Sequence, residues 1–206
     1  TSSCCPAFVS LVRKHFPALL PFVSTTVSPM VAAERYIRSK RPEAVTVFIG
    51  PCIAKKNEVM SQYIQELEYV LTFEELYAML CAKGIEAEAI AVPDTGDDAT
   101  RYGKGFALAG GVTAAVQRVI EEKGVDVSLS VAKCSGADEC RKALMLLKAG
   151  KLPDDFVEGM ACVGGCVGGP SSHMAIAGFQ KERNAQIAQA DDLGSKIVPG
   201  ADALTG

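Results

Sequence analysis

The sequence predicts an α/β fold with mainly parallel sheets flanked by helices. Segments with helical spacing of apolar residues alternate with short β-branched apolar runs, which is the order typical of parallel pairing. The turns between them are rich in Gly and Pro. With 206 residues, 49% hydrophobic and 22% charged, the chain is long and apolar enough to bury a sizeable core.

The first half of the chain opens with two predicted helices and a strand. Apolar spacing predicts a helix over residues 8–20, which Pro17 ends or kinks. A second helix is predicted over 29–40, with Pro29 in its first turn. The apolar run at 44–50 predicts a buried strand that ends at a Pro-Cys turn.

A capping box marks the next helix. Thr72 followed by Glu75 predicts a helix start, and Lys83-Gly84 predicts its end. The alternating pattern at 85–92 then predicts a strand.

The second half continues the alternation of elements. We predict, in order, a loop at 93–105, a helix at 106–124, a strand at 125–133, a helix at 137–150 and a strand at 155–162. The polar, Ala-rich tail is predicted to be helical and then linker-like, so that the chain divides into 1–173 and 174–206.

Charge and hydropathy exclude several partners. The net charge of −3 gives no basis for a nucleic-acid partner. No apolar run reaches the roughly 18 residues of a membrane span, so no membrane contact is expected. No secretory signal is visible, and a cytoplasmic location is predicted. Because the first residue is Thr1, we expect the chain to be part of a longer protein.

Eight cysteines indicate metal or redox chemistry. Five of them gather in three Gly- and Pro-rich turns: Cys4, Cys5, Cys52, Cys162 and Cys166. Four thiolates bind a [4Fe–4S] cubane, and glycine lets backbone N–H groups approach its sulfides. Structural zinc uses similar ligands but more often in Cys-x-x-Cys pairs, which this chain lacks.

The remaining cysteines are interpreted as structural. Cys81 lies inside a predicted helix and is expected to be a buried small hydrophobe. Cys134 and Cys140 are expected to be structural thiols. The Gly-rich stretch 103–111 lacks the ending of a phosphate loop and is predicted to pack as a turn onto the lobe that holds the cysteines.

Three motifs occur in a fixed order along the chain. The first signature is TSSCCP at 1–6, the second is PCIAKKNE at 51–58, and the third is EGMACVGGCVGG at 158–169. Together they resemble the signatures of the iron-only ([FeFe]) hydrogenases, over roughly residues 1–170. The resemblance implies the C-terminal part of the catalytic domain of the large subunit, in a divergent branch, with two lobes around a cluster cleft.

The resemblance also implies the cofactor and its ligands. In this family it is the H-cluster, a [4Fe–4S] cubane linked to a di-iron subcluster with CO and cyanide ligands. Matched to the signatures, the cubane ligands are Cys5, Cys52, Cys162 and Cys166, and Cys166 bridges to the di-iron unit. A chain produced without the maturation proteins is expected to lack this cofactor.

Further residues take their roles from the same match. Cys4 is the implied proton-relay thiol, followed by Ser24 and Glu58. Lys55 is implied to contact a cyanide ligand, since an ammonium group is a strong donor to an anion in a dry pocket. The implied cofactor-lining residues are Pro51, Met160 and Gly165.

Three departures from the family pattern support the divergent branch. Phe8 stands where the family usually has Trp, and Gly50 stands where it usually has Met. The third signature ends in Gly-Gly-Pro at Pro170, without the usual Gly-Gln.

The implied function is the reversible reduction of protons to H2, with an electron carrier such as ferredoxin as partner. A hydrogen sensor and a non-catalytic iron–sulfur carrier are the alternatives. Sensory members often lose the relay cysteine, which is kept here as Cys4. Carriers keep the cubane ligands but lose the di-iron pocket, whereas Lys55 and Pro51 are retained.

Overall fold

A computed structural model of the chain describes residues 1–61, 69–91 and 99–192. The elements are α1 (Pro6–His15), η1 (Pro17–Phe22), α2 (Pro29–Lys40), β1 (Val47–Gly50), α3 (Ala54–Met60), β2 (Tyr69–Thr72), α4 (Phe73–Ala82), η2 (Ala87–Ala89), α5 (Arg101–Gly105), α6 (Gly111–Glu122), β3 (Val131–Ser135), α7 (Ala137–Lys148), β4 (Phe156–Met160), η3 (Cys166–Gly168) and α8 (Ile176–Gln189), where η denotes a 3₁₀ helix. None of the helices in the described ranges is long and apolar enough to cross a membrane.

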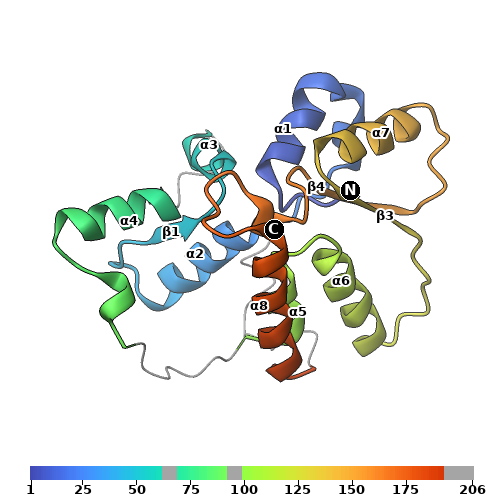
Figure 1. Ribbon diagram of the computed structural model, residues 1–206. Helices are drawn as coiled ribbons and strands as arrows, with labels where there is room; N and C mark the ends of the chain where they lie inside the picture. The colour runs from blue at the N-terminus through green and yellow to red at the C-terminus, as the bar shows by residue number, and fades with distance from the viewer. Residues whose placement is uncertain (62–68, 92–98, 193–206) are drawn as a thin grey trace.

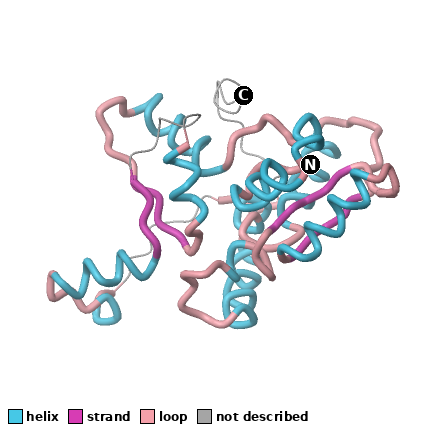
Figure 2. The backbone as a smooth tube through the Cα atoms, turned by 90° about the horizontal axis from the view of Figure 1, so that it is seen from above, coloured by secondary structure: helices cyan, strands magenta, loops and turns pink. Residues whose placement is uncertain are grey.

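The strands form two separate parallel pairs in the part of the chain that the structure describes. β1 pairs with β2, and Val47 lies opposite Tyr69. β3 pairs with β4, and Val131 lies opposite Phe156. The pairs lie apart in space, each with its own helices (Figures 1 and 2). The prediction of parallel sheets flanked by helices in two lobes is therefore confirmed.

Each sheet has its own apolar core. The larger core joins α1, η1, β3, α7 and β4 and consists of Phe8, Val12, Phe16, Leu19, Cys134, Cys140, Ala143, Leu144 and Val157. The smaller one centres on Met30 and Val31 of α2, which pack against Phe48 and Val70 of the other sheet. Because the cores are separate, residues between the lobes are free to line a site.

Local sequence signals define several element ends as predicted. Pro17 ends α1 and starts a 3₁₀ turn. The capping box is formed, because Thr72 Oγ1 accepts the N–H of Glu75 at 3.2 Å and Glu75 Oε2 accepts the N–H of Thr72 at 2.8 Å. Gly84 follows α4 with φ +67°, a conformation that glycine adopts without steric cost.

Two predicted strands are missing or shortened, and a third, the buried strand predicted at 44–50, spans only Val47–Gly50 and is less buried than expected, since Val47 is 44% and Ile49 41% exposed. The described part of 85–92 contains the 3₁₀ turn η2 and no strand, and its apolar Ile90 is 57% exposed. Strand β3 begins at Val131 rather than at 125, since Val125 and Val127 are about half exposed. In both places the alternating sequence has no neighbouring strand to pair with, so propensity alone does not produce a strand.

Helix boundaries also shift in the second half. The predicted helix 106–124 begins only at Gly111, because the preceding residues form a turn against the third signature. The predicted loop 93–105 contains the short helix α5 where it is described. The prediction for Cys81 is wrong: the thiol is exposed, because α4 has no buried residue. Cys134 and Cys140 are buried free thiols, as expected for structural cysteines.

Helix α3 and strand β2 were absent from the sequence-based prediction, whereas helix α8 lies in the tail that was predicted to be helical. Helix α3 lies inside the Pro-Cys turn of the second signature, and β2 directly precedes the capping box that dominates its local pattern. Helix α8 packs against α5, and Arg101 Nη1 contacts Asp192 Oδ1 at 2.7 Å. The domain division at residue 173 stays a prediction, and the linker-like stretch 194–206 lies outside the described residues.

Gly159 provides a direct test of how α1 meets β4. A Cβ atom at this position would lie 2.3 Å from the ring of the fully buried Phe8. We therefore expect Gly159→Ala to lower the free energy of unfolding by about 2 kcal/mol through overpacking. The control is Gly105→Ala in α5, where no atom lies within 4 Å of the added Cβ. Urea denaturation of both variants checks this, and equal stabilities would contradict it.

Candidate functional site

Backbone hydrogen bonds bring the three cysteine signatures together. The N–H of Ser2 donates to the carbonyl of Val157 at 2.9 Å, and the N–H of Gly159 donates to Ser2 Oγ at 3.0 Å. These bonds attach the first signature to β4 in the third. The N–H of Ser171 donates to the carbonyl of Pro51 at 3.2 Å, which attaches the end of the third signature to the second.

All five cysteines of the signatures line one cavity of about 190 Å³ between the lobes. Lys55, Pro51, Met160 and Gly165 line the same cavity. Nine of the eleven predicted site residues therefore meet at one place; Ser24 and Glu58 lie elsewhere.

Element ends position each thiol. Cys4 and Cys5 directly precede α1, whose first residue is a proline. Cys52 lies between β1 and α3. Cys162 follows β4, and Cys166 begins η3. Thiols placed at the ends of helices and strands point into the gap between lobes while the elements themselves pack in the two cores.

The turn that carries Cys162 and Cys166 depends on glycine. Gly165 has φ +91°, and a Cβ there would lie 2.6 Å from the carbonyl oxygen of Ala107 and the nitrogen of Ala109. The close neighbour is the stretch before α6, which forms a β-bridge between Leu108 and Gly165. The prediction that the Gly-rich stretch packs onto the cysteine lobe is confirmed.

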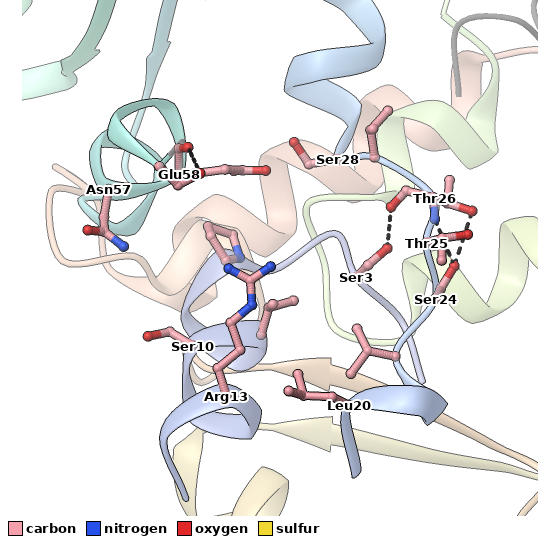
Figure 3. A pocket seen from close by; sticks show the side chains of 15 residues that line it. Ser3, Ser10, Arg13, Leu20, Ser24, Thr25, Thr26, Ser28, Asn57 and Glu58 are labelled. Carbon is pink, nitrogen blue, oxygen red and sulfur yellow. Dashed lines mark hydrogen bonds between the residues drawn. The ribbon is translucent and has the colours of Figure 1, made fainter. Parts of the chain in front are cut away.

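The buried ion pair of the second signature lies beside the thiols. Lys55 is 7% exposed, and its Nζ contacts Glu58 Oε2 at 2.7 Å. Lys55 lines the cysteine cavity, whereas Glu58 lines a second cavity of about 440 Å³ (Figure 3). The pair thus connects two neighbouring cavities.

Ser24 does not line the cysteine cavity, but it lines two neighbouring cavities. It lines the cavity that contains Glu58, where Figure 3 shows its hydroxyl beside Thr26, with an Oγ–Oγ1 distance of 3.1 Å. It also lines a third cavity, of about 520 Å³, together with Cys4. The predicted relay residues therefore lie along adjoining cavities rather than in one.

Burial is the main influence on the pKa values of the cavity's thiols. Burial raises the pKa of Cys4 to about 11, with the charges of Cys5 and Glu158 adding to the rise and Lys55 opposing it. Burial raises the pKa of Cys166 to about 12. A thiol with such a pKa is protonated at neutral pH, so a bound metal must displace its proton.

Similar effects act on two further thiols. Burial raises the pKa of Cys162, and the nearby Cys5 and Cys52 add to the rise. Burial also raises the pKa of Cys52, but hydrogen bonds from the N–H groups of Lys55 and Ala54 oppose it. The first turn of α3 thus offers donors to a thiolate at this position.

Phe48 is one of several cavity-lining residues that sequence reasoning did not name. Phe48 of β1 lines the cysteine cavity, and a Cβ atom at Gly50 would lie 2.9 Å from its ring. The ring therefore occupies the space that a side chain at position 50 would enter. The sequence signal that could have indicated this is Gly50, which stands two positions after Phe48 where the family usually has Met.

The donor set suits a multi-iron cluster better than one ion. Within the described ranges, no three His, Cys, Asp or Glu side chains are arranged to hold a single metal ion. A zinc ion needs its sulfurs about 2.3 Å away, hence close to one another. Four thiols that line one cavity, beside the backbone of Gly165, are the donor set that a cubane takes.

The fold and the site define a class of protein. It is an α/β protein with two lobes, each built on a parallel pair of strands, and five cysteines line a cavity between the lobes. A family model described as "Iron only hydrogenase large subunit, C-terminal domain" matches residues 1–170. The chain therefore belongs to this family, as the signatures predicted.

Curated relatives include enzymes and assembly factors. The chain is 30% identical to the periplasmic [Fe] hydrogenase large subunit of Nitratidesulfovibrio vulgaris, over 82% of this chain and 50% of that one. It is 29% identical to a probable cytosolic Fe–S cluster assembly factor of Brugia malayi, over 80% of this chain and 46% of that one. The chain thus spans about half the length of these relatives.

Solved structures agree with the fold. An apo [FeFe]-hydrogenase from Chlamydomonas reinhardtii superposes with a TM-score of 0.69 at 21% identity, covering 97% of this chain and 68% of that one. At this identity the likeness supports the two-lobed architecture alone.

Two adjacent lysines test the importance of the buried ion pair. Lys55→Met leaves Glu58 in a nearly buried position without its cation, and we expect a loss of about 3 kcal/mol in the free energy of unfolding. Lys56→Met removes a half-exposed contact with Glu75, with an expected loss under about 1 kcal/mol. Urea denaturation of the metal-free variants measures both. A comparable loss in the two variants would contradict the account.

Proposed function

We propose that this chain is the cluster-binding part of an iron-only hydrogenase catalytic domain, which interconverts H2 with protons and electrons. One observation carries the proposal: five cysteines from three separate signatures, together with a buried lysine, line a single cavity. Coincidental buried thiols have no reason to converge in this way with the sequence order of a known family.

In this proposal, Cys5, Cys52, Cys162 and Cys166 hold a [4Fe–4S] cubane as thiolates. Cys166 would also hold the di-iron part of the cofactor. When bound, this H-cluster would supply the electron storage and the iron chemistry that interconverts protons and H2. The protein's contribution is to hold, orient and shield the group and to move protons.

Lys55 is proposed to donate its ammonium hydrogens to an anionic ligand of the cofactor. Its Nζ lies 2.7 Å from Glu58 Oε2, and this contact fixes the position of the ammonium group. The apolar side chains of Pro51 and Met160 and the backbone of Gly165 are proposed to surround the cofactor and exclude water. In such a low-dielectric cavity a charged hydrogen bond is stronger than in water.

Proton movement is assigned to Cys4, Ser24 and Glu58. Cys4 lines both the cysteine cavity and the cavity that Ser24 reaches. Ser24 in turn shares a cavity with Glu58. The thiol of Cys4, whose pKa is raised by burial, is proposed to hold a proton at neutral pH and to pass it between the cofactor and these cavities.

The implied partners follow from the chemistry. Electrons require a carrier such as ferredoxin, and insertion of the di-iron unit requires maturation proteins. A cytoplasmic location remains part of the proposal; the named relatives comprise one periplasmic and one cytosolic protein.

A second candidate is an iron–sulfur carrier without H2 activity. The similarity to a cluster assembly factor over 80% of the chain favours it. The presence of Lys55 and Cys4 at the cavity, which a cubane alone does not need, favours the enzyme.

The adjacent cysteines of the first signature separate the two candidates. In full-length, matured protein we expect infrared bands of metal-bound CO and cyanide, together with H2 evolution from a reduced viologen dye. Cys4→Ala should keep these bands but lose at least about 99% of turnover, because the proton relay is interrupted. Cys5→Ala should lose the cubane and its iron.

The exposed Cys81, mutated to Ala, is the matched control and should keep both bands and turnover. A protein with full iron–sulfide content but no infrared bands after maturation would instead support the carrier. Undiminished turnover in Cys4→Ala would remove this residue from the relay.

A further inference from the structure

Glu158, the first residue of the third signature, has no assigned role in the site. It lies on β4, its side chain is completely buried, and it precedes Cys162 by only four residues. A buried carboxylate is costly unless donors surround it. The hydrogen-bond donors around Glu158 therefore indicate what the residue does in the fold.

The partners of Glu158 all belong to the N-terminus of α6. Its Oε1 accepts the N–H of Gly110 at 2.8 Å. Its Oε2 accepts both the N–H of Thr113, at 2.8 Å, and the hydroxyl of the same threonine. Charge-assisted bonds of this kind are among the stronger ones in proteins, and the helix N-terminus favours the negative charge.

Helix α6 depends on this carboxylate for its cap. Its N-cap residue is Gly110, with φ +88°, which has no side chain to accept the free N–H groups of the first turn. Glu158 supplies that acceptor from a strand 45–48 residues away in the sequence.

The residues directly before α6 are also hydrogen-bonded to the turn that carries Cys162 and Cys166. The N–H of Ala109 donates to the carbonyl of Gly164 at 3.1 Å, and the N–H of Val167 donates to the carbonyl of Ala107 at 3.3 Å. Together with the bonds to Glu158, residues 107–113 therefore contact the third signature before Cys162, between Cys162 and Cys166, and directly after Cys166. Attachments on both sides of the turn fix its position and its orientation.

We propose that Glu158 and Thr113 form a positioning pair that locks the segment 107–113 against the third signature and thereby sets the geometry of Cys162 and Cys166. Neither residue of the pair lines the cysteine cavity. Its relevance to cluster binding rests on the proposed function, but the lock itself is a property of the metal-free protein.

The test uses Thr113→Val, which removes one donor to the buried carboxylate at nearly constant shape. Thr113→Ser keeps the hydroxyl and is the rescue variant. The matched control is Thr100→Val: Thr100 is also buried and caps α5 through the N–H of Gly103 at 3.1 Å. Full-length protein prepared without metal is treated with iodoacetamide, and alkylation rates of individual cysteines are followed by mass spectrometry.

We expect Cys162 and Cys166 to react about tenfold faster in Thr113→Val, as their turn opens more often. Cys52 lines the same cavity but belongs to the second signature, and its rate should be unchanged. Thr113→Ser and Thr100→Val should behave like the parent protein.

Three results would overturn the proposal: unchanged rates in Thr113→Val, equal acceleration of Cys52, or a Thr113→Ser variant as fast as Thr113→Val. Because the readout needs neither cluster nor H2, failure of the hydrogenase proposal leaves this result intact. In cluster-loaded protein, iron loss to a chelator should likewise be about tenfold faster in Thr113→Val than in Thr100→Val.

Discussion

The site depends on one set of backbone hydrogen bonds, those that β4 and the turn after it make to the other two signatures. The bond between Gly159 and Ser2 joins residues 157 positions apart, and the bond between Ser171 and Pro51 closes the other side. These contacts are made by main-chain groups, apart from one serine hydroxyl. They bring thiols from distant parts of the chain to one cavity, and each lobe's own core holds the elements that carry them.

Packing beneath these bonds explains two departures from the family pattern. Phe8 is fully buried, and its ring lies directly against Gly159, so an aromatic at position 8 and a glycine at 159 are matched to each other. Gly50 leaves space that the Phe48 ring occupies at the edge of the cavity. Gly50 therefore bears on the shape of the cavity, whereas Phe8 lies in the core beneath β4, and neither position supplies a thiol.

Sequence reasoning predicted the parallel two-lobed fold and the meeting of the three signatures, because each rests on strong local patterns: the capping box at Thr72, the proline after α1 and the ordered Cys motifs. It failed where pairing decides the outcome. The residues near Ile90 alternate like a strand but have no partner, and β2 is a strand of only four residues whose partner is remote in sequence. The role of Glu158 was equally out of reach, since its partners lie 45 or more residues away.

The central claim is that three separate cysteine turns together hold one [4Fe–4S] cubane. The most direct measurement is Mössbauer spectroscopy of the protein reconstituted anaerobically with ⁵⁷Fe and sulfide, compared with its Cys52→Ala and Cys162→Ala variants. The account predicts a cubane spectrum in the parent protein and its loss when a cysteine is removed from either turn. A cubane that survives both substitutions, or a parent protein that binds only isolated iron, would contradict the account.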